Sequence, residues 1–408
     1  MSTTTAFSTP PSSSNVASMP ALAVDFGPNG GSFTGLVTTS PIAPGDQGAY
    51  AKVYEIAGHD PADFRIKDET VHFRAWNQSS RSKDGDRDII TLYAYGADFI
   101  RISEADRAVE DMAPLMAIAH ANWRKRPAVK PKDLTRVVVI SDAQIGKVGS
   151  RGGTPALLER IADLLWQLDS IMLDQPCRDA VIADPGDLTE GFENVAAQQF
   201  TNDLSHPAQL RAARGILTNI VTTVAARHHA TVVATVPSNH AAWRKGKNVL
   251  GRPCDDYGID SHMAVHEALS RDPKFKHVTW EFPSDWDESL TIKVRGAVVG
   301  MVHGHQVGKP DSIPGWWKGQ AHGSQAVKDA TILITGHYHH FRAQPSGAVN
   351  GVSRTWFQAP TMDNGSDWYR NASGEDSEPG ILTFTIDDAG RWDNLRLITP
   401  SPALEVAA

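Results

Sequence analysis

The stretch Val137-Val-Val-Ile-Ser-Asp-Ala-Gln144 ends a short apolar run with a carboxylate and an amide, and the same design recurs four times further along the chain. Runs of this length and composition are typical of buried parallel strands. The five runs are residues 137–140, 180–183, 231–236, 298–302 and 331–335. The polar clusters that follow them are Asp142-Ala-Gln144, Gly186-Asp187, Ser238-Asn-His240, His303-Gly-His305 and Gly336-His-Tyr-His339. Because the carboxyl ends of parallel strands meet at one edge of a sheet, we expect these side chains to converge.

Carboxylate, amide and imidazole groups together form a ligand set that suits a pair of divalent metal ions. Each cluster alone is weak evidence, since a lone Asp after a strand is more often a turn former. Alternating histidines, as in His303-Gly-His305, place both rings on the same side of an extended segment. Two such pairs, each after an apolar run, combine with the other three clusters to predict a two-metal hydrolase.

Length and composition narrow the class of protein. The chain has 408 residues, enough for one large domain with a small one, or for two of medium size. A net charge of −8 argues against wholesale non-specific binding of nucleic acid, although it is compatible with a local basic patch. Cys177 and Cys254 form no metal-binding pair, which favours a reducing compartment without a disulfide framework. With no apolar run of about 20 residues and no secretory signal, we expect a cytoplasmic protein without membrane contact.

Composition also divides the chain into segments. Residues 1–30 are rich in Ser, Thr and Pro and are expected to be a disordered leader. Residues 31–120 predict a small α+β module, with a hairpin of strands 71–76 and 90–95, a charged loop between them and a helix from residue 104. Residues 121–133 form a basic, proline-containing linker. The linker and the loop are either solvated or contacts for an anionic polymer.

Residues 134–400 alternate strands with helices, which predicts a layered α/β domain. Thr154-Pro155 is a typical helix start, with Thr as the N-cap and Pro in the first turn. A second amphipathic helix is expected over residues 210–224. Strands at 355–358, 381–386 and 395–398 predict a β-rich end.

The five clusters, in this order, resemble the calcineurin-like metallophosphoesterase superfamily. Its pattern is Asp-x-His, Gly-Asp, Gly-Asn-His, a His before Gly, and Gly-His-x-His. The resemblance covers roughly residues 134–398, and flanking text such as Trp316-Trp-Lys-Gly-Gln320 looks closest to versions encoded by bacteriophages of actinobacteria. It implies an α/β fold with a four-layer β-sandwich flanked by helices and a dinuclear site at its edge, to which the small N-terminal β-containing module is added.

The resemblance also implies the part that each matching residue plays. Asp187 would bridge both ions. One ion would be completed by Asp142, Gln144 and His339, and the other by Asn239, His303 and His337. His240 would be the catalytic residue that protonates the leaving oxygen or steadies the transition state. His305 would lie just outside the ligands, where it could contact the substrate phosphate. Apart from the resemblance, Arg244, four residues beyond His240, is either a second contact for that phosphate or a surface arginine.

Two positions depart from the family pattern. Gln144 replaces the usual first His and is a poorer ligand, although a similar Asp-x-Gln occurs in the branch that resembles manganese-dependent ADP-ribose and CDP-alcohol pyrophosphatases. Ser238 replaces the Gly before Asn239, at some cost if that position needs a positive φ. Manganese is the first choice for the two ions, and mixed oxygen and imidazole ligands also accept iron, zinc or nickel.

The activity expected is metal-dependent hydrolysis of phosphodiester bonds by a nuclease-like phosphodiesterase. The partner would be a phosphodiester substrate, with DNA and nucleotides as candidates, and protein partners are not predicted. One alternative is a nucleotide pyrophosphatase, which Gln144 favours. Another is a catalytically decayed binding or scaffold protein, for which Gln144 is again the one supporting feature.

Overall fold

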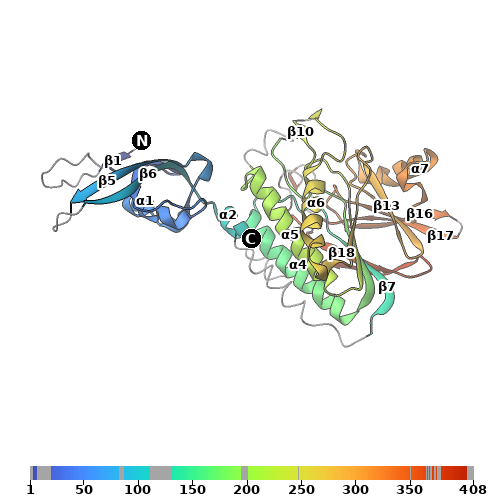
Figure 1. Ribbon diagram of the computed structural model, residues 1–408. Coiled ribbons are helices and arrows are strands. Elements are labelled where there is room, and N and C mark those ends of the chain that lie inside the picture. The colour runs from blue at the N-terminus through green and yellow to red at the C-terminus, as the bar shows by residue number, and fades with distance from the viewer. Residues whose placement is uncertain are drawn as a thin grey trace. The chain divides into compact units, whose positions relative to one another are not determined.

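The computed structural model divides into two compact units, Met1–Glu104 and Ala105–Ala408, each considered by itself here (Figure 1). The residues that it describes are 3–6, 20–81, 87–110, 130–193, 201–246, 248–349, 351–363, 365, 367, 370, 371, 374 and 378–401.

The first unit is a sheet that curls around a small aromatic core. Its strands run in the order β1 (Thr3–Ala6), β2 (Ala23–Gly27), β3 (Gly30–Thr38), β6 (Arg87–Arg101) and β4 (Phe64–Ile66), with β5 (His72–Arg81) also paired to β6. Helix α1 (Ala51–Ile56) contributes Val53 and Tyr54 to the core, where they join Phe33 and Phe99. The predicted hairpin is confirmed as β5 and β6, which are longer than expected because the antiparallel pairing continues to Arg81 and Arg87.

The expectation of a disordered leader over residues 1–30 is wrong for the described part. β1 and β2 pair with each other, and β2 pairs with β3. Val24 is buried, and the Phe26 ring lies 5.0 Å from the rings of both Phe64 and Phe99. A strand with two apolar side chains on a ready-made sheet buries enough surface to order itself. Residues 7–19 lie outside the described part.

The boundary of the first unit also differs from the expectation. Helix α2 (Glu104–Glu110) begins where predicted, but its Ala105 and Val109 pack in the core of the second unit, so the module ends at Glu104 and not at residue 120. The expected linker lies mostly outside the described residues. Its last two residues, Lys132 and Asp133, already belong to strand β7.

The second unit contains two mixed sheets. The six-stranded sheet has the order β12 (Val278–Glu281), β9 (Ala230–Thr235), β8 (Cys177–Asp184), β7 (Lys132–Val139), β18 (Ile381–Ile386) and β19 (Trp392–Ile398). The five-stranded sheet has the order β13 (Ser289–Val294), β14 (Ala297–Val302), β15 (Ile332–Thr335), β17 (Val352–Gln358) and β16 (Arg342–Val349). β7, β8, β9 and β12 are parallel in the first sheet, and β14, β15 and β17 are parallel in the second. All five expected strands are therefore confirmed.

Three buried clusters define four layers. Val138 and Ile140 face helices α4 (Thr154–Asp174), α5 (His206–Ala225) and α6 (Tyr257–Ser270), whereas Val137 and Val139 face the five-stranded sheet. Helix α7 (Ile313–His322) covers the outer face of the five-stranded sheet through Ile313 and Trp317. In Figure 1, α4, α5 and α6 lie together on one side and α7 lies on the other. The predicted helix-flanked β-sandwich is confirmed. Because successive side chains of β7 point to opposite faces of the sheet, this one strand contributes residues to both cores.

The start of α4 differs in one detail. Gly153 is the residue before the first turn, and Thr154 lies inside the helix with Pro155. The Thr154 N–H and hydroxyl both donate to the Asp203 carboxylate, at 2.6 and 2.7 Å, so a distant carboxylate caps this helix. The remaining short elements are the strand pair β10 (Arg244–Lys245) and β11 (Asn248–Val249), and 3₁₀ turns at Gln47–Tyr50, Pro61–Asp63, Asp68–Thr70, Pro273–Phe275, Pro310–Ser312 and Ala326–Asp329. Among the described helices, none has the length and apolar character needed to span a membrane.

Candidate metal centre

The five predicted clusters lie at the carboxyl ends of parallel strands from both sheets. Asp142 follows β7, Asp187 follows β8, and Asn239 with His240 follows β9. From the other sheet, His303 follows β14 and His337 follows β15. Because the strand ends of the two sheets face one another here, residues more than a hundred positions apart come into contact.

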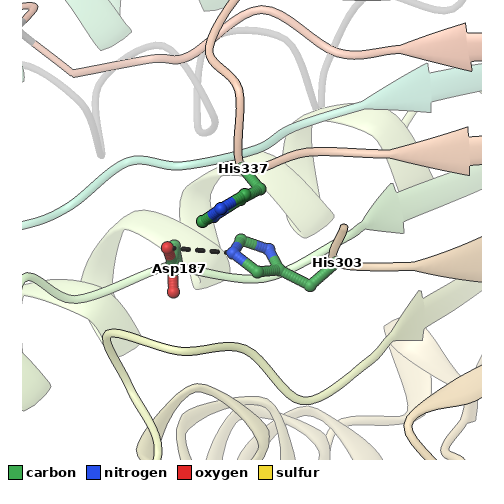
Figure 2. Close-up of side chains that lie close together, drawn as sticks. All are labelled: Asp187, His303 and His337. Atoms are coloured by element: carbon green, nitrogen blue, oxygen red, sulfur yellow. Dashed lines mark ion pairs between the residues drawn. The ribbon is translucent and has the colours of Figure 1, made fainter. Parts of the chain in front are cut away.

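Asp187, His303 and His337 form the core of the centre. One ligand atom from each lies within 4.8 Å of the other two. Figure 2 shows the His303 imidazole beside the Asp187 carboxylate, with their contact dashed, and the His337 imidazole above them. His303 Nε2 lies 3.0 Å from Asp187 Oδ2 and 2.9 Å from Asn239 Oδ1. One carboxylate, one amide oxygen and two imidazoles therefore meet at one place.

The hydrogen bonding of His303 tests whether this place suits a cation. His303 Nδ1 lies 2.8 Å from the Pro185 carbonyl, which only accepts, so Nδ1 carries a proton. In the neutral ring, Nε2 then presents a lone pair to two oxygens. Asp187 Oδ2 is itself buried and accepts no hydrogen bond from the described residues. Two oxygens that lie about 3 Å from the same ring nitrogen need a cation between them, either a proton on Nε2 or a metal ion in its place, and a backbone carbonyl on the far nitrogen is the usual support of a metal-binding His. The residues fit a divalent ion.

The protonation tendencies of these groups follow from the same charges. Burial alone would lower the pKa of His303, but the Asp187 carboxylate outweighs it and raises that pKa to about 9. Burial alone would raise the pKa of Asp187, yet His303 and His240 hold it well below its usual range. Burial and the neighbouring His303 lower the pKa of His337 to about 3, so its ring stays neutral and can serve as a ligand.

Backbone strain concentrates at the same residues. Among the described non-glycine residues, eight have a positive φ, and five of them are predicted metal ligands. These five are Asp142 (49°), Gln144 (40°), Asp187 (55°), His337 (70°) and His339 (61°). A left-handed conformation costs a non-glycine residue roughly 1–3 kcal/mol and persists where the surrounding structure enforces it. The loops are thus bent to aim these side chains inward.

The turn before Asp187 is tightly packed. Gly186 has a φ of +106°, and a Cβ there would lie 2.6 Å from the Ser238 Cβ and 3.2 Å from His303 Nδ1. Ser238 itself is not among the residues with positive φ, and its N–H and hydroxyl donate to Asp256 Oδ2 at 3.0 and 3.2 Å. The cost considered for Ser in place of Gly at this position therefore does not arise.

The other half of the predicted ligand set is arranged differently. Both oxygens of Asp142 accept the His337 N–H, at 3.1 and 3.0 Å, and one also accepts the Ser141 hydroxyl. His339 Nε2 lies 3.5 Å from Asp142 Oδ1. Gln144 Oε1, the expected ligand atom, instead accepts a 2.6 Å hydrogen bond from Lys147 Nζ. Asp142 and His339 therefore lie close together as predicted, whereas the Gln144 side-chain oxygen is hydrogen-bonded to Lys147.

His240 is fixed at both its backbone and its ring. Its N–H donates to Asp187 Oδ1 at 2.7 Å, and its Nδ1 lies 3.1 Å from both the carbonyl and Oε2 of Glu190. Burial alone would lower the pKa of His240, but Asp187 and Glu190 raise it to about 9. With Nδ1 bound to Glu190, Nε2 is the nitrogen that can hold a proton for a substrate.

Arg244 and His305 lie beside the ligands. Arg244 donates to the Asn239 carbonyl at 2.7 Å and to the Gly246 carbonyl at 2.8 Å, so it also braces the Asn239 turn. The His305 ring centre lies 5.4 Å from that of His303, and burial with the nearby His303 lowers the pKa of His305 to about 4. His305 Nδ1 is buried and has no hydrogen-bond partner in the described part of the chain. Contact of either residue with a phosphate stays a prediction.

A cavity of about 60 Å³ adjoins His240. Its lining is mainly aromatic and basic: Phe192, His206, His240, Trp243, Arg244 and Tyr257 take part. Phe192 and Trp243, which both line this cavity, are 40% and 47% exposed.

Sequence reasoning missed two residues of the centre, Asp363 and Lys147. Asp363 follows β17 and pairs with Lys147, and the signal was present, because a polar residue again follows an apolar parallel strand. Lys147 gives no such signal, since it lies three residues beyond Gln144 in a loop. His262 lies outside the centre and is buried against Asp184, at the end of β8.

Comparisons with known proteins add little to this geometry. No family model and no curated protein matches the chain. Among solved structures, Vps29 from Entamoeba histolytica, complexed with zinc, is similar at 15% identity and a TM-score of 0.30, over 65% of this chain and 99% of that one. A predicted phosphoesterase from Streptococcus pneumoniae is similar at 10% identity and a TM-score of 0.27, over 66% of this chain and 95% of that one. A purple acid phosphatase from yellow lupin (Lupinus luteus) is similar at 8% identity and a TM-score of 0.30, over 93% of this chain and 73% of that one. At such scores we draw no conclusion about activity from these proteins.

Proposed function

We propose that this protein is a divalent-metal-dependent phosphoesterase. The observation that carries the proposal is that Asp187 Oδ2 and Asn239 Oδ1 both lie within 3.0 Å of His303 Nε2, with His337 alongside. A bound divalent ion would lower the pKa of an attacking water and neutralise charge on the phosphoryl oxygens. The ligand order along the chain supports the resemblance to calcineurin-like metallophosphoesterases, and the bacteriophage type remains a prediction.

The surrounding residues have tasks that follow from their contacts. The Glu190 carboxylate holds the His240 ring and favours its protonated form, which suits donation of a proton to a leaving oxygen. Arg244 lies on the same cavity and carries a planar set of donors suited to phosphate oxygens. The buried, strained loops hold these groups in place before substrate binds, so little reorganisation accompanies the reaction.

The substrate we propose is a phosphodiester, cleaved by a nuclease-like phosphodiesterase. Exposed Phe192 and Trp243 beside Arg244 offer a surface on which a nucleobase can stack. The same surface suits a nucleotide pyrophosphatase, the second candidate, for which Gln144 is the favouring residue. Manganese is the proposed metal, because carboxylate and amide oxygens with two imidazoles suit it; iron, zinc and nickel are alternatives.

The test is hydrolysis of bis-(p-nitrophenyl) phosphate by the full chain with added manganese. We expect turnover with the metal and none with a chelator. Stoichiometric metal binding without turnover of any phosphoester would instead favour a catalytically decayed binding or scaffold protein. Rates on single- and double-stranded DNA, ADP-ribose and a cyclic nucleotide then separate the two enzymes. Cleavage of the small nucleotides alone would contradict the nuclease-like activity and favour the pyrophosphatase.

A further inference from the structure

Lys147 lies inside the candidate centre. Its ammonium donates to Gln144 Oε1 at 2.6 Å and pairs with Asp363 Oδ2 at 2.5 Å. The Lys147 side chain is 15% exposed and that of Asp363 only 2%. A lysine with both of its contacts directed inward is unusual, because lysines normally extend the ammonium into water.

The backbone around Lys147 is held firmly. Its N–H donates to the Gln144 carbonyl, and it forms an isolated antiparallel bridge with Asn202. Ile145, two residues earlier, bridges to Thr189 in the same loop region. The lysine therefore starts from a fixed point close to the ligands.

The charges around the ammonium explain its position. The Asp363 carboxylate, itself only 2% exposed, supplies the opposite charge that compensates the burial of the ammonium. A lysine ammonium has three donors and no lone pair to offer a metal.

The groups that Lys147 touches belong to the half of the centre where the sequence predicted one of the two ions. Gln144 Oε1 is the predicted ligand atom, and Asp363 Oδ2 lies 3.9 Å from Nδ1 of the predicted ligand His339. His339 in turn lies 3.5 Å from Asp142 through Nε2. A divalent ion placed among these groups would be strongly repelled by the ammonium at such short range.

We propose that the Lys147 ammonium takes the place of the second metal ion, so that the centre holds a single divalent ion at Asp187, Asn239, His303 and His337. The inference rests on the proposed function, since that one ion is the ion of the phosphoesterase. A fixed ammonium can also donate to a phosphoryl oxygen, as a second ion would. The Asp-x-Gln departure then has a reason, because a neutral amide accepts a hydrogen bond from lysine.

The experiment counts ions in the full chain. Purified protein is loaded with manganese, dialysed, and measured by elemental analysis and electron paramagnetic resonance. We expect one manganese per chain and a six-line spectrum of isolated ions. Two ions per chain with an exchange-coupled spectrum would overturn the inference while leaving the proposed function intact. Failure to bind any ion would overturn the proposed function itself.

A variant tests the lysine directly. Lys147→Gln removes the charge and keeps much of the length, and Lys318→Gln, at an exposed position of α7, is the matched control. We expect Lys147→Gln to take up a second, exchange-coupled ion and the control to stay at one. A Lys147→Gln protein that folds and still binds one ion would show that Lys147 is not what excludes the second. If the Lys147→Gln protein does not fold, the number of manganese ions bound by the unmutated chain still tests the inference.

Discussion

His262 Nε2 lies 2.8 Å from Asp184 Oδ2, and the other oxygen of Asp184 accepts the Gly186 N–H at 2.9 Å. His262 is on α6 and Asp184 ends β8, and both are buried. This chain of hydrogen bonds links a helix to the turn that carries Asp187. The position of a central ligand therefore depends on a residue outside the centre.

Replacing His262 should weaken both folding and metal binding. His262→Leu leaves a buried carboxylate unpaired, and we expect a loss of about 2–4 kcal/mol in the free energy of unfolding. Metal affinity should fall roughly 10- to 100-fold, because the turn is no longer braced. His262→Gln retains a donor near Nε2 and should recover most of both. Urea unfolding measures the free energy of unfolding, and calorimetric titration with manganese measures the metal affinity. If His262→Leu and His262→Gln gave the same values, the hydrogen bond between His262 and Asp184 would not be the cause.

Asp187→Asn should remove metal binding and activity together. The change is nearly isosteric but deletes the charge that faces His303. We expect a fall in kcat/KM of roughly 10³-fold or more, since several kcal/mol of transition-state stabilisation depend on the ion. The control is Asp260→Asn, at an exposed position of α6 where Asp260 pairs with Arg214. It should leave metal binding and kcat/KM unchanged. Wild-type activity of the Asp187→Asn variant would show that the Asp187 carboxylate is not needed in the metal centre.

His240→Ala should slow the reaction without releasing the metal. The contact between His240 and Asp187 runs through the backbone N–H, which alanine keeps. A lost general acid costs roughly 10²- to 10⁴-fold, and less when the leaving group needs no proton. We therefore expect a smaller loss on bis-(p-nitrophenyl) phosphate than on a phosphodiester with an alkyl leaving group. An equal loss on both would speak against proton donation.

Gly186→Ala should disturb the centre through its Cβ. The new methyl would lie 2.6 Å from the Ser238 Cβ at a φ of +106°. Gly347 has a similar φ of +96°, and a Cβ there would meet nothing within 4 Å. Both alanines carry the backbone strain of about 1–2 kcal/mol, but only Gly186→Ala adds a clash. Metal titration should show weakened binding for Gly186→Ala alone; matching affinities would mean that the turn relaxes.

His228 should make folding sensitive to acid. Burial, with Arg136 and Arg227 nearby, lowers the pKa of His228 to about 4, and its Nδ1–H donates to the Val224 carbonyl at 2.7 Å. In the unfolded chain an imidazole has a pKa of about 6.5, so between pH 6.5 and 4 the unfolded state binds a proton that the folded state does not. Its contribution to stability is complete above pH 6.5 and is lost as the pH falls to 4, at up to about 1.4 kcal/mol per pH unit.

His228→Asn keeps a donor for Val224 and cannot titrate. Urea unfolding at pH 7, 6 and 5 should therefore show a flatter pH dependence for this variant than for the parent. His322→Asn, at an exposed position, should leave the slope unchanged. Identical slopes for His228→Asn and the parent would mean that His228 does not control acid sensitivity.

Local sequence predicted the strands of the second unit and most residues at their ends. Apolar runs such as Val137-Val-Val-Ile140 favour buried strands, and polar residues directly after such strands lie at the edge of the sheet. The first unit was harder to read. The Ser- and Pro-rich composition of the first residues hid the alternation of Leu22, Val24 and Phe26. These side chains are ordered by distant partners: Phe26, for example, packs against Phe99, 73 positions further along the chain.

The sequence by itself determined the apolar runs that form the buried strands and placed Asp187, Asn239, His303 and His337 just after them, because hydrophobic periodicity is a local property. The sandwich of two sheets was expected only from the family resemblance. Only the tertiary structure decided what lies between these four residues. The Lys147 contact with Gln144 and Asp363, and the support of Asp184 by His262, join segments with no shared pattern. Such pairs form where burial makes an unpartnered charge too costly, and that cost depends on the packed whole and not on any one stretch of chain.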